Sequence, residues 1–181
     1  MTFGCFLILA VLGANIARGQ TAGIKHPPGR AIAPSDRLQV RASIDPASAK
    51  AGTPIVVKLV SKNIWYDTLI VSDYGSEVDY ELIVFDSSGK ELRRTRLGNQ
   101  LFLGEYVLLR TAVTYLEPGQ ETRAEIEVTK IYEATQPGTY YLWATRDPLP
   151  DSPDEPTPTG DQSKRPIERA FSNPVQFTIV P

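Results

Sequence analysis

From Leu38 to the end of the chain, apolar and polar residues alternate with a period of two in a series of short runs. In the first run Leu38, Val40 and Ala42 alternate with polar residues, and Pro46 follows the run. Successive side chains of a β-strand point to opposite sides, so this pattern predicts strands that each bury one face. The predicted strands cover residues 38–45, 55–62, 80–85, 107–115, 123–128, 140–144 and 175–179.

Turn-forming residues separate the predicted strands at short intervals. Gly89 follows an Asp-Ser-Ser segment and is expected at positive φ in a hairpin. Two Pro-Gly pairs, which end at Gly119 and Gly138, have the order favoured at the centre of type II turns. Residues 129–135 predict one short helical turn. Together these signals predict an all-β fold, an antiparallel β-sandwich of seven to nine strands.

Residues 1–19 have the character of a secretory signal peptide. Residues 3–16 are uncharged and mostly apolar, but they are too few to span a bilayer, which takes ~20 residues. Ala17 and Gly19 provide the small side chains of a cleavage site. No positive charge precedes the apolar stretch, which is unusual for such a signal. We expect export to the periplasm or the cell exterior, with no transmembrane span left after cleavage.

The rest of the chain divides into a tether and one domain. Residues 20–36 are rich in Pro and Gly and predict a flexible tether, and residues 37–181 carry all the predicted strands. Within the domain, residues 147–172 form a long loop rich in Pro, Asp, Ser and Thr. Loops longer than ~12–15 residues are commonly functional or disordered. This loop is therefore expected to recognise a partner or to be a tolerated insertion.

The composition excludes several kinds of chemistry. The one Cys, Cys5, lies in the signal segment, so the mature domain has neither a disulfide nor a thiolate ligand. The one His, His26, lies in the tether, where a catalytic base would not be held near a nucleophile. Zinc sites take about four ligands, mostly Cys and His. The acids of the long loop lack the spacing of a calcium loop. We therefore expect no metal and no other cofactor.

The charge of the chain bears on its partners. The formal net charge is −2, and loss of Arg18 with the signal makes it more negative. This charge argues against nucleic acid as a partner, because nucleic-acid binding needs a basic surface. Arg93, Arg94 and Arg96 form a small basic cluster that we interpret as a solvated strand edge. Acidic residues alternate outward along one predicted strand, at Glu121, Glu125 and Glu127.

Three segments resemble bacterial immunoglobulin-like domains. Gly138-Thr139-Tyr140 resembles the start of strand F, where such domains have a tyrosine corner whose hydroxyl bonds to upstream backbone. Residues 80–90 resemble the C-strand hairpin, and residues 172–179 resemble the last strand. The resemblance implies an immunoglobulin-like β-sandwich in which Gly138 and Tyr140 have structural roles. The chain is also distantly similar to small bacterial proteinase-inhibitor domains and to modules of secreted metalloproteases, but this similarity provides no functional residues.

Two pairs of aromatic residues are the candidate binding residues. If the alternate residues of their strand face the core, Tyr141 and Trp143 face outward and form a flat apolar surface. Such a surface stacks on a sugar or anchors a protein, unless another segment covers it. Trp65 and Tyr66 follow the end of a predicted strand. They either form an exposed loop tip or close one end of the sandwich.

These observations favour a non-enzymatic function. The first hypothesis is an exported, non-catalytic binding module of the bacterial cell envelope, whose partner is another protein or a surface glycan. The second is an inhibitor of a secreted or periplasmic protease that acts through the long loop. The third is a hydrolase that uses only carboxylates, which would need two facing, buried carboxylates in a cleft. The sequence gives no indication of the oligomeric state.

Overall fold

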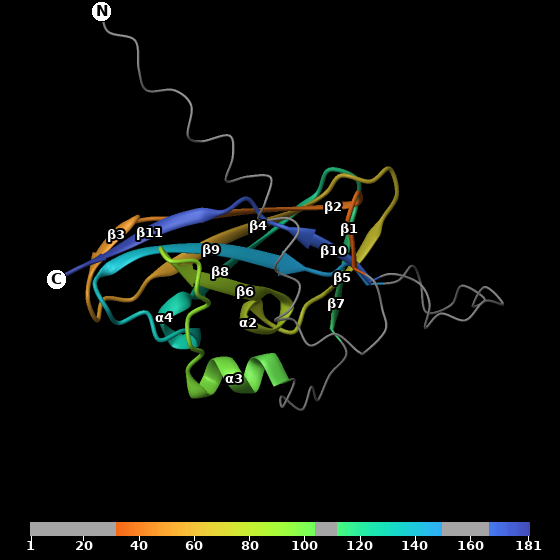
Figure 1. Ribbon diagram of the computed structural model, residues 1–181. Coiled ribbons are helices and arrows are strands. Elements are labelled where there is room, and N and C mark those ends of the chain that lie inside the picture. The colour runs from red at the N-terminus through yellow and green to blue at the C-terminus, as the bar shows by residue number, and fades with distance from the viewer. Residues whose placement is uncertain (1–31, 104–111, 150–166) are drawn as a thin grey trace, which may run out of the picture.

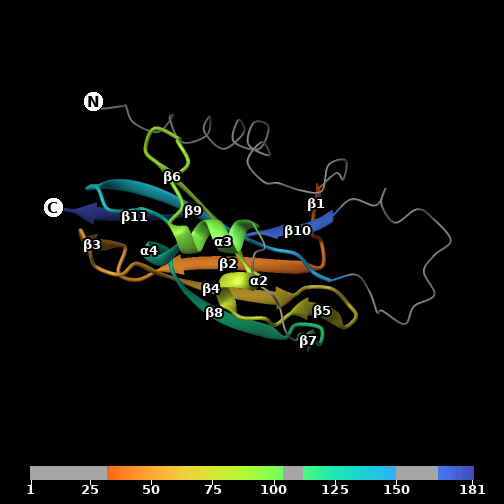
Figure 2. The ribbon, with the colours of Figure 1, turned by 90° about the horizontal axis from the view of Figure 1, so that it is seen from below.

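The computed structural model describes residues 32–103, 112–149 and 167–181, which form two packed layers of β-strands with short helices along one side (Figures 1 and 2). Within these residues there are eleven strands, more than the seven to nine expected, because several have only three or four residues. The strands are β1 Ile32–Pro34, β2 Leu38–Ile44, β3 Ser48–Lys50, β4 Val56–Asn63, β5 Leu69–Ser72, β6 Glu81–Asp86, β7 Val113–Leu116, β8 Glu121–Glu127, β9 Gly138–Arg146, β10 Ile167–Phe171 and β11 Val175–Val180.

The first layer is built around β9, the longest strand. β6 pairs with one edge of β9, and β10 and β11 pair with the other edge, all antiparallel. Two short strands extend this layer through parallel pairing, β1 beside β10 and β3 beside β11. We call this layer the β9 sheet. It faces the viewer in Figure 1 and forms the upper layer in Figure 2.

The second layer contains β2, β4 and β8 in antiparallel order. The pairing of β2-β4-β8 on one side and β6-β9-β11 on the other corresponds to strands A-B-E and C-F-G of an immunoglobulin domain. The fold is therefore the immunoglobulin-like sandwich that the sequence predicted. A separate antiparallel pair, β5 with β7, lies at one end of the molecule.

The core lies between the two layers and follows the predicted alternation. On β2, Leu38, Val40 and Ala42 are buried, and Leu82 and Val84 of β6 belong to the same core from the other layer. Burial of apolar surface contributes ~25 cal/mol per Å². The alternation therefore accounts for the strand positions, because each strand buries one of its two faces.

Tyr140 fixes the start of β9. Its ring is buried and stacks on Phe177 with centroids 5.2 Å apart. Its hydroxyl donates a hydrogen bond of 2.6 Å to the carbonyl of Gln136, which is the bond that a tyrosine corner makes. Gly138 begins β9 and is not among the glycines with positive φ. The prediction of a type II turn at this position is therefore wrong. Gly119 does have a φ of 81°, as its turn requires.

Three short helices lie along the side of the sandwich where β6 and β8 form the edges (Figure 1). They are α2 Ser76–Asp79, α3 Arg96–Leu103 and α4 Val128–Ile131. Helix α4 overlaps the expected turn at 129–135, whereas α2 and α3 were not predicted. Gly98 lets α3 approach α4 closely, because a Cβ on this residue would lie 2.2 Å from the carbonyl oxygen of Ile131.

Several predicted segments differ from the structure or lie outside the described residues. The tether expected at 20–36 ends in a strand, since β1 pairs with β10. The loop expected at 147–172 is shorter at its C-terminal end, because β10 pairs with β9. Polar residues in β10 obscured its pattern. The signal segment, most of the tether and loop residues 150–166 lie outside the described residues. No helix among the described residues is both long and apolar enough to span a membrane.

Candidate functional site

The outer face of the β9 sheet carries a compact group of apolar side chains. The register places Phe85 of β6 opposite Tyr141 of β9, and Ile83 opposite Trp143. The alternate residues of both strands, Leu82 and Val84 among them, face the core. These four outward residues therefore share one face, and we call them the outer apolar group: Ile83, Phe85, Tyr141 and Trp143.

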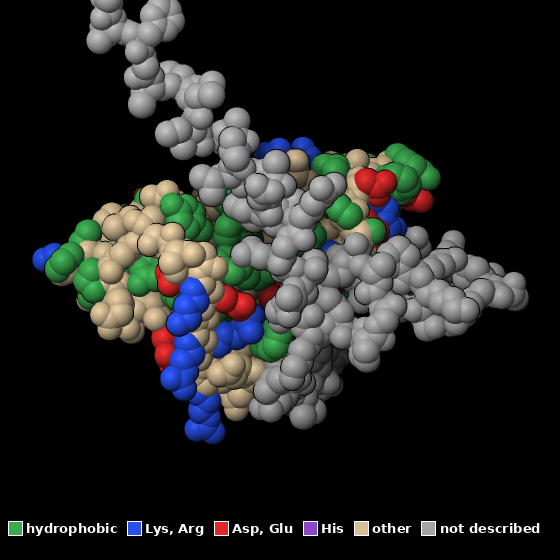
Figure 3. Space-filling model, in the orientation of Figure 1, with side chains coloured by type: hydrophobic (Ala, Val, Ile, Leu, Met, Phe, Trp, Pro, Cys, Tyr) green, Lys and Arg blue, Asp and Glu red, His purple; other side chains and the backbone are tan. Residues whose placement is uncertain are grey.

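The members of the outer apolar group contact one another across the strands. Phe85 and Trp143 are diagonal neighbours whose ring centroids lie 5.6 Å apart at an interplanar angle of 79°, an edge-to-face contact. Tyr141 is 36% exposed, and the other three side chains are half-buried. Figure 3 shows hydrophobic side chains over the middle of β9 on this face of the molecule. Tyr141 is thus directly accessible, and Trp143 is partly covered.

The second predicted pair is Trp65 and Tyr66. One residue closes the end of the sandwich, and the other lies at an exposed loop tip. Trp65 packs against the core, while Tyr66 is 79% exposed, and their ring centroids lie 4.3 Å apart. The buried side chain of Asn63 holds this loop by accepting a hydrogen bond of 2.8 Å from the backbone N–H of Trp65. Trp65 helps to close one end of the sandwich, and Tyr66 is a loop-tip residue away from the outer apolar group.

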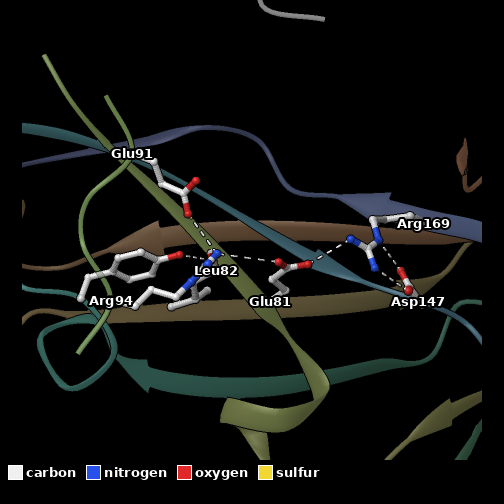
Figure 4. A network of polar contacts seen from close by, with 7 residues as sticks. Glu81, Leu82, Glu91, Arg94, Asp147 and Arg169 are labelled. Carbon is white, nitrogen blue, oxygen red and sulfur yellow. Dashed lines mark hydrogen bonds and ion pairs between the residues drawn. The ribbon is translucent and has the colours of Figure 1, made fainter. Parts of the chain in front are cut away.

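A network of charged side chains continues the outer face beyond Ile83 (Figure 4). Arg169 of β10 lies between two carboxylates. Its Nη1 donates to Glu81 Oε2 at 3.0 Å, and its Nε and Nη2 donate to the two oxygens of Asp147 at 2.7 and 2.8 Å. The Arg169 side chain is 9% exposed, so this ion pair is largely shielded from water. The network joins β6, β10 and the segment after β9.

Arg94 completes the network from the segment before α3. Its Nη2 forms ion pairs with Glu91 at 3.0 Å and with Glu81 at 4.0 Å. Its guanidinium carbon lies 3.9 Å from the centroid of the Phe102 ring. In this cation–π arrangement the ring attracts the positive charge of the arginine. The Arg94 side chain is only 15% exposed, so the interpretation of this arginine as part of a solvated edge is wrong. Arg93, at 84% exposed, does lie in solvent.

Burial changes the acid–base properties of this network. Desolvation raises the pKa of Glu81 above its usual value, although Arg169 and Arg94 act in the opposite direction. Desolvation likewise raises the pKa of Tyr132 to about 12, which keeps its hydroxyl protonated. This hydroxyl donates to the carbonyl of Leu82 at 2.6 Å. The two arginines thus stabilise the charged form of Glu81, whereas burial destabilises it.

The network lines a cavity of about 210 Å³ at the start of β6. Its charged side chains are those of Glu77, Glu81, Arg94 and Arg169, and other residues of α2, α3 and α4 complete its walls. Figure 3 shows acidic and basic side chains next to each other on this part of the surface, above the position of α3. Among the described residues, no group of three metal-ligating side chains lies close enough to hold a metal ion.

The arrangement of the carboxylates bears on the hydrolase hypothesis. Glu81 and Asp147 do not face each other across a gap that holds a substrate bond, because the guanidinium of Arg169 lies between them and bonds to both. Glu91 is paired with Arg94 in the same way. This network can bind polar groups through its remaining donors and acceptors.

The sequence pointed to the outer apolar group but not to the charged network. Ile83 and Phe85 are apolar and lie on the outer side of β6, so both faces of this strand are apolar. That pattern could have predicted an apolar outer surface. Arg94 and Arg169 gave no such signal. Their partners lie on other strands, and Arg169 is separated from Glu81 by 88 positions in the chain.

The chain resembles known proteins only weakly, and only in structure. The sequence matches no protein-family model and no curated protein. The CARDB domain of a Pyrococcus furiosus protein, in complex with di-metal ions, is similar over 82% of this chain and 93% of that chain, with 13% identity and a TM-score of 0.37. AvmM, which catalyses macrocyclization in alchivemycin A biosynthesis, is similar over 87% of this chain and 95% of that chain, with 12% identity and a TM-score of 0.37. Similarities this weak carry no conclusion about the ligand or activity of this chain.

Proposed function

We propose that this protein is an exported, non-catalytic binding module of the bacterial cell envelope that binds its partner with the outer face of the β9 sheet. The observation that carries the proposal is the register of β6 with β9, which gathers four apolar side chains on the face away from the core. Outward positions of a sheet with one solvated face are commonly polar. Clustered apolar positions on such a face are typical of interaction surfaces.

The chemistry of this face suits a glycan or a protein partner. Tyr141 and the exposed Phe171 of β10 offer aromatic surface, and the polar network beginning at Glu81 adjoins the apolar group. Aromatic rings bury large areas at a small cost in side-chain entropy, and they bind well to the apolar faces of sugars or to protein anchors. The rigid strands hold these residues in place before binding, which reduces the entropy cost of association.

The test compares two exposed tyrosines in a binding assay. Purified protein lacking residues 1–19 is incubated with washed bacterial cell envelopes, and the sedimented fraction is measured. We expect Tyr141→Ala to lower the bound fraction at least about fivefold, because interface aromatics contribute ~1–2 kcal/mol or more. Tyr66→Ala removes a more exposed tyrosine outside the outer apolar group and should leave binding unchanged.

Treatment of the envelopes identifies the class of partner. Loss of binding after periodate oxidation would indicate a glycan, and loss after protease digestion would indicate a protein. Either result supports the proposal when Tyr141→Ala also reduces binding. Equal binding by wild type and Tyr141→Ala, or loss only in Tyr66→Ala, would rule out the outer face of the β9 sheet as the interaction surface.

A further inference from the structure

The cavity at the start of β6 contains a carboxylate oxygen that lacks a hydrogen-bond donor. Oε1 of Glu81 is buried and accepts no hydrogen bond among the described residues. Its nearest ion-pair partner, Nη2 of Arg94, is 4.0 Å away, which is beyond hydrogen-bond distance. A buried acceptor without a donor is destabilising, and more so when it is charged. A bound molecule with an O–H or N–H group would remove that cost.

The same cavity also offers hydrogen-bond donors. Both ion pairs of Arg94 use Nη2, and the guanidinium also hydrogen-bonds with the Tyr132 side chain, which engages only part of its five N–H groups. Contact with the Phe102 ring and the ion pair with Glu91 hold this guanidinium in one orientation. A ligand that reaches Arg94 therefore meets a donor positioned beside the acceptor of Glu81.

The charges around the cavity bear on the charge of the ligand. Two arginines, Arg94 and Arg169, are already paired with three carboxylates, and the exposed Glu77 of α2 adds a further carboxylate to the lining, which disfavours an anion. An anionic ligand would have to compete with Glu91 for Arg94, and a cationic ligand would approach the Arg94 guanidinium. A hydroxyl group both donates and accepts, so it satisfies Glu81 and Arg94 at once without adding charge.

The walls and the size of the cavity restrict the ligand further. Apolar side chains from α2, α3 and α4 form part of the lining, namely Val78, Leu101, Phe102 and Ile131. The volume of about 210 Å³ is below the ~300–1,000 Å³ of sites for drug-sized ligands. A pyranose ring combines the required features, because its hydroxyls lie at the edge and its C–H groups form an apolar face.

We propose that this cavity binds one ring of a neutral saccharide, with Glu81 accepting a hydrogen bond from a sugar hydroxyl and Arg94 donating one. The inference rests on the proposed binding function. It specifies a saccharide as the ligand of the cavity and of the adjoining outer apolar group. Glu81 and Ile83 lie on the same side of β6, and Ile83 is opposite Trp143. A glycan with one ring in the cavity can therefore continue over the outer apolar group.

The experiment is saturation-transfer NMR with the processed protein and four neutral sugars: glucose, galactose, mannose and N-acetylglucosamine. Glucosamine and glucuronate serve as charged probes of the same ring size. We expect transfer to at least one neutral sugar and weaker transfer to both charged ones. Absence of transfer to all four neutral sugars, or a preference for a charged probe, would overturn the inference.

Variants locate the bound sugar. Val78→Trp at the cavity rim, where Val78 is 38% exposed, and Leu101→Trp in its wall should each weaken binding about tenfold or more by filling the space. Val78→Trp alters an exposed position, so it keeps the test valid if Leu101→Trp fails to fold. Glu81→Gln should weaken binding about tenfold, since hydrogen bonds to charged groups are the stronger ones. Glu125→Gln on the exposed side of β8 is the matched control and should have no effect.

The outcomes separate this inference from the proposed function. Tyr141→Ala should still bind the monosaccharide, because Tyr141 does not line the cavity. Loss of sugar binding in Tyr141→Ala, with binding retained in Val78→Trp and Leu101→Trp, would place the sugar on the outer apolar group and overturn the cavity inference alone. Absence of sugar binding together with envelope binding that depends on Tyr141 would have the same meaning.

Discussion

Tyr140 and Tyr141 are adjacent tyrosines with opposite roles. The ring of Tyr140 is buried between the layers, and its hydroxyl bonds to the backbone that leads into β9. The side chain of Tyr141 points outward, and its hydroxyl has no hydrogen bond within the described residues. The period of two along a strand is sufficient to separate a structural residue from a candidate binding residue one position away.

The first prediction concerns the hydroxyl of Tyr140. Tyr140→Phe keeps the stacked ring and removes only the donor to the Gln136 carbonyl, so the free energy of unfolding should fall by about 1 kcal/mol. Urea denaturation followed by tryptophan fluorescence measures the change. Tyr141→Phe removes the same atom from an outward residue and should shift stability by less than about 0.5 kcal/mol. Equal effects of the two substitutions would contradict the structural role of Tyr140.

At the scale of elements, the contact between α3 and α4 depends on one glycine. The carbonyl of Ile131 occupies the space where a Cβ on Gly98 would lie, at 2.2 Å. Backbone cannot move aside as a flexible side chain does, so a larger residue must push the two helices apart. Since α3 also forms a wall of the cavity, its position affects both packing and the candidate saccharide site.

Gly98→Ala is therefore expected to destabilise the protein even though alanine favours helix formation. The steric cost of overpacking is typically ~1–3 kcal/mol, which exceeds the ~1 kcal/mol gained in helix propensity. Thermal unfolding of Gly98→Ala and Asn99→Ala measures the difference, because Asn99 is an exposed residue of the same helix. A stability of Gly98→Ala equal to or above that of wild type would show that α3 does not pack tightly on α4.

The elements that could be predicted from the sequence are those whose signal is local. Strands β2 and β4 follow the alternation almost residue for residue, since each buries one face. Strand β5 has only four residues, too few to show a period, and it pairs with β7 more than 40 positions later. Helix α3 contains a glycine that serves a contact with α4, which no local pattern reveals. The same holds for Arg94, whose burial depends on Phe102 and on a carboxylate of β6.

Two glutamates on the β9 sheet should respond to pH in opposite directions. Burial raises the pKa of Glu81 in the folded state. Burial also opposes ionisation of Glu168, but hydrogen bonds from Arg37 and Ser35 outweigh it and lower the pKa of Glu168. Glu81 therefore stabilises the fold most below its unfolded pKa, and this contribution is lost as pH rises through the folded pKa. The contribution of Glu168 is present above its unfolded pKa and is lost as pH falls through the folded value.

Replacement of each glutamate by glutamine removes its contribution to the pH dependence of the free energy of unfolding. As pH rises from about 3 to 7, Glu81→Gln should become more stable relative to wild type, and Glu168→Gln should become less stable relative to wild type. Urea denaturation at several pH values gives both differences, and the other titrating groups cancel in the comparison with wild type. Parallel slopes for the two variants would show that the environments of these carboxylates do not differ in the way the structure indicates.

At the scale of the whole molecule, the two proposed contact regions lie on the same layer. The outer apolar group and two members of the charged network, Glu81 and Arg169, belong to the outer face of the β9 sheet, whereas α2, α3 and α4 lie along one side of the sandwich. One continuous face thus combines apolar surface with a polar cavity. The other layer, β2-β4-β8, contributes the second half of the core.

The last prediction concerns the processing that the proposed envelope function requires. We propose that residues 1–19 direct export and are removed after Gly19, because an apolar stretch is followed by small residues at Ala17 and Gly19. Intact-mass spectrometry of protein from the periplasm or culture medium should therefore find Gln20 as the first residue. Gly19→Trp should block cleavage, and Thr2→Lys should increase the exported fraction by supplying the positive charge that the start of the chain lacks. Recovery of the uncleaved chain from the cytoplasm alone would contradict both export and a function in the cell envelope.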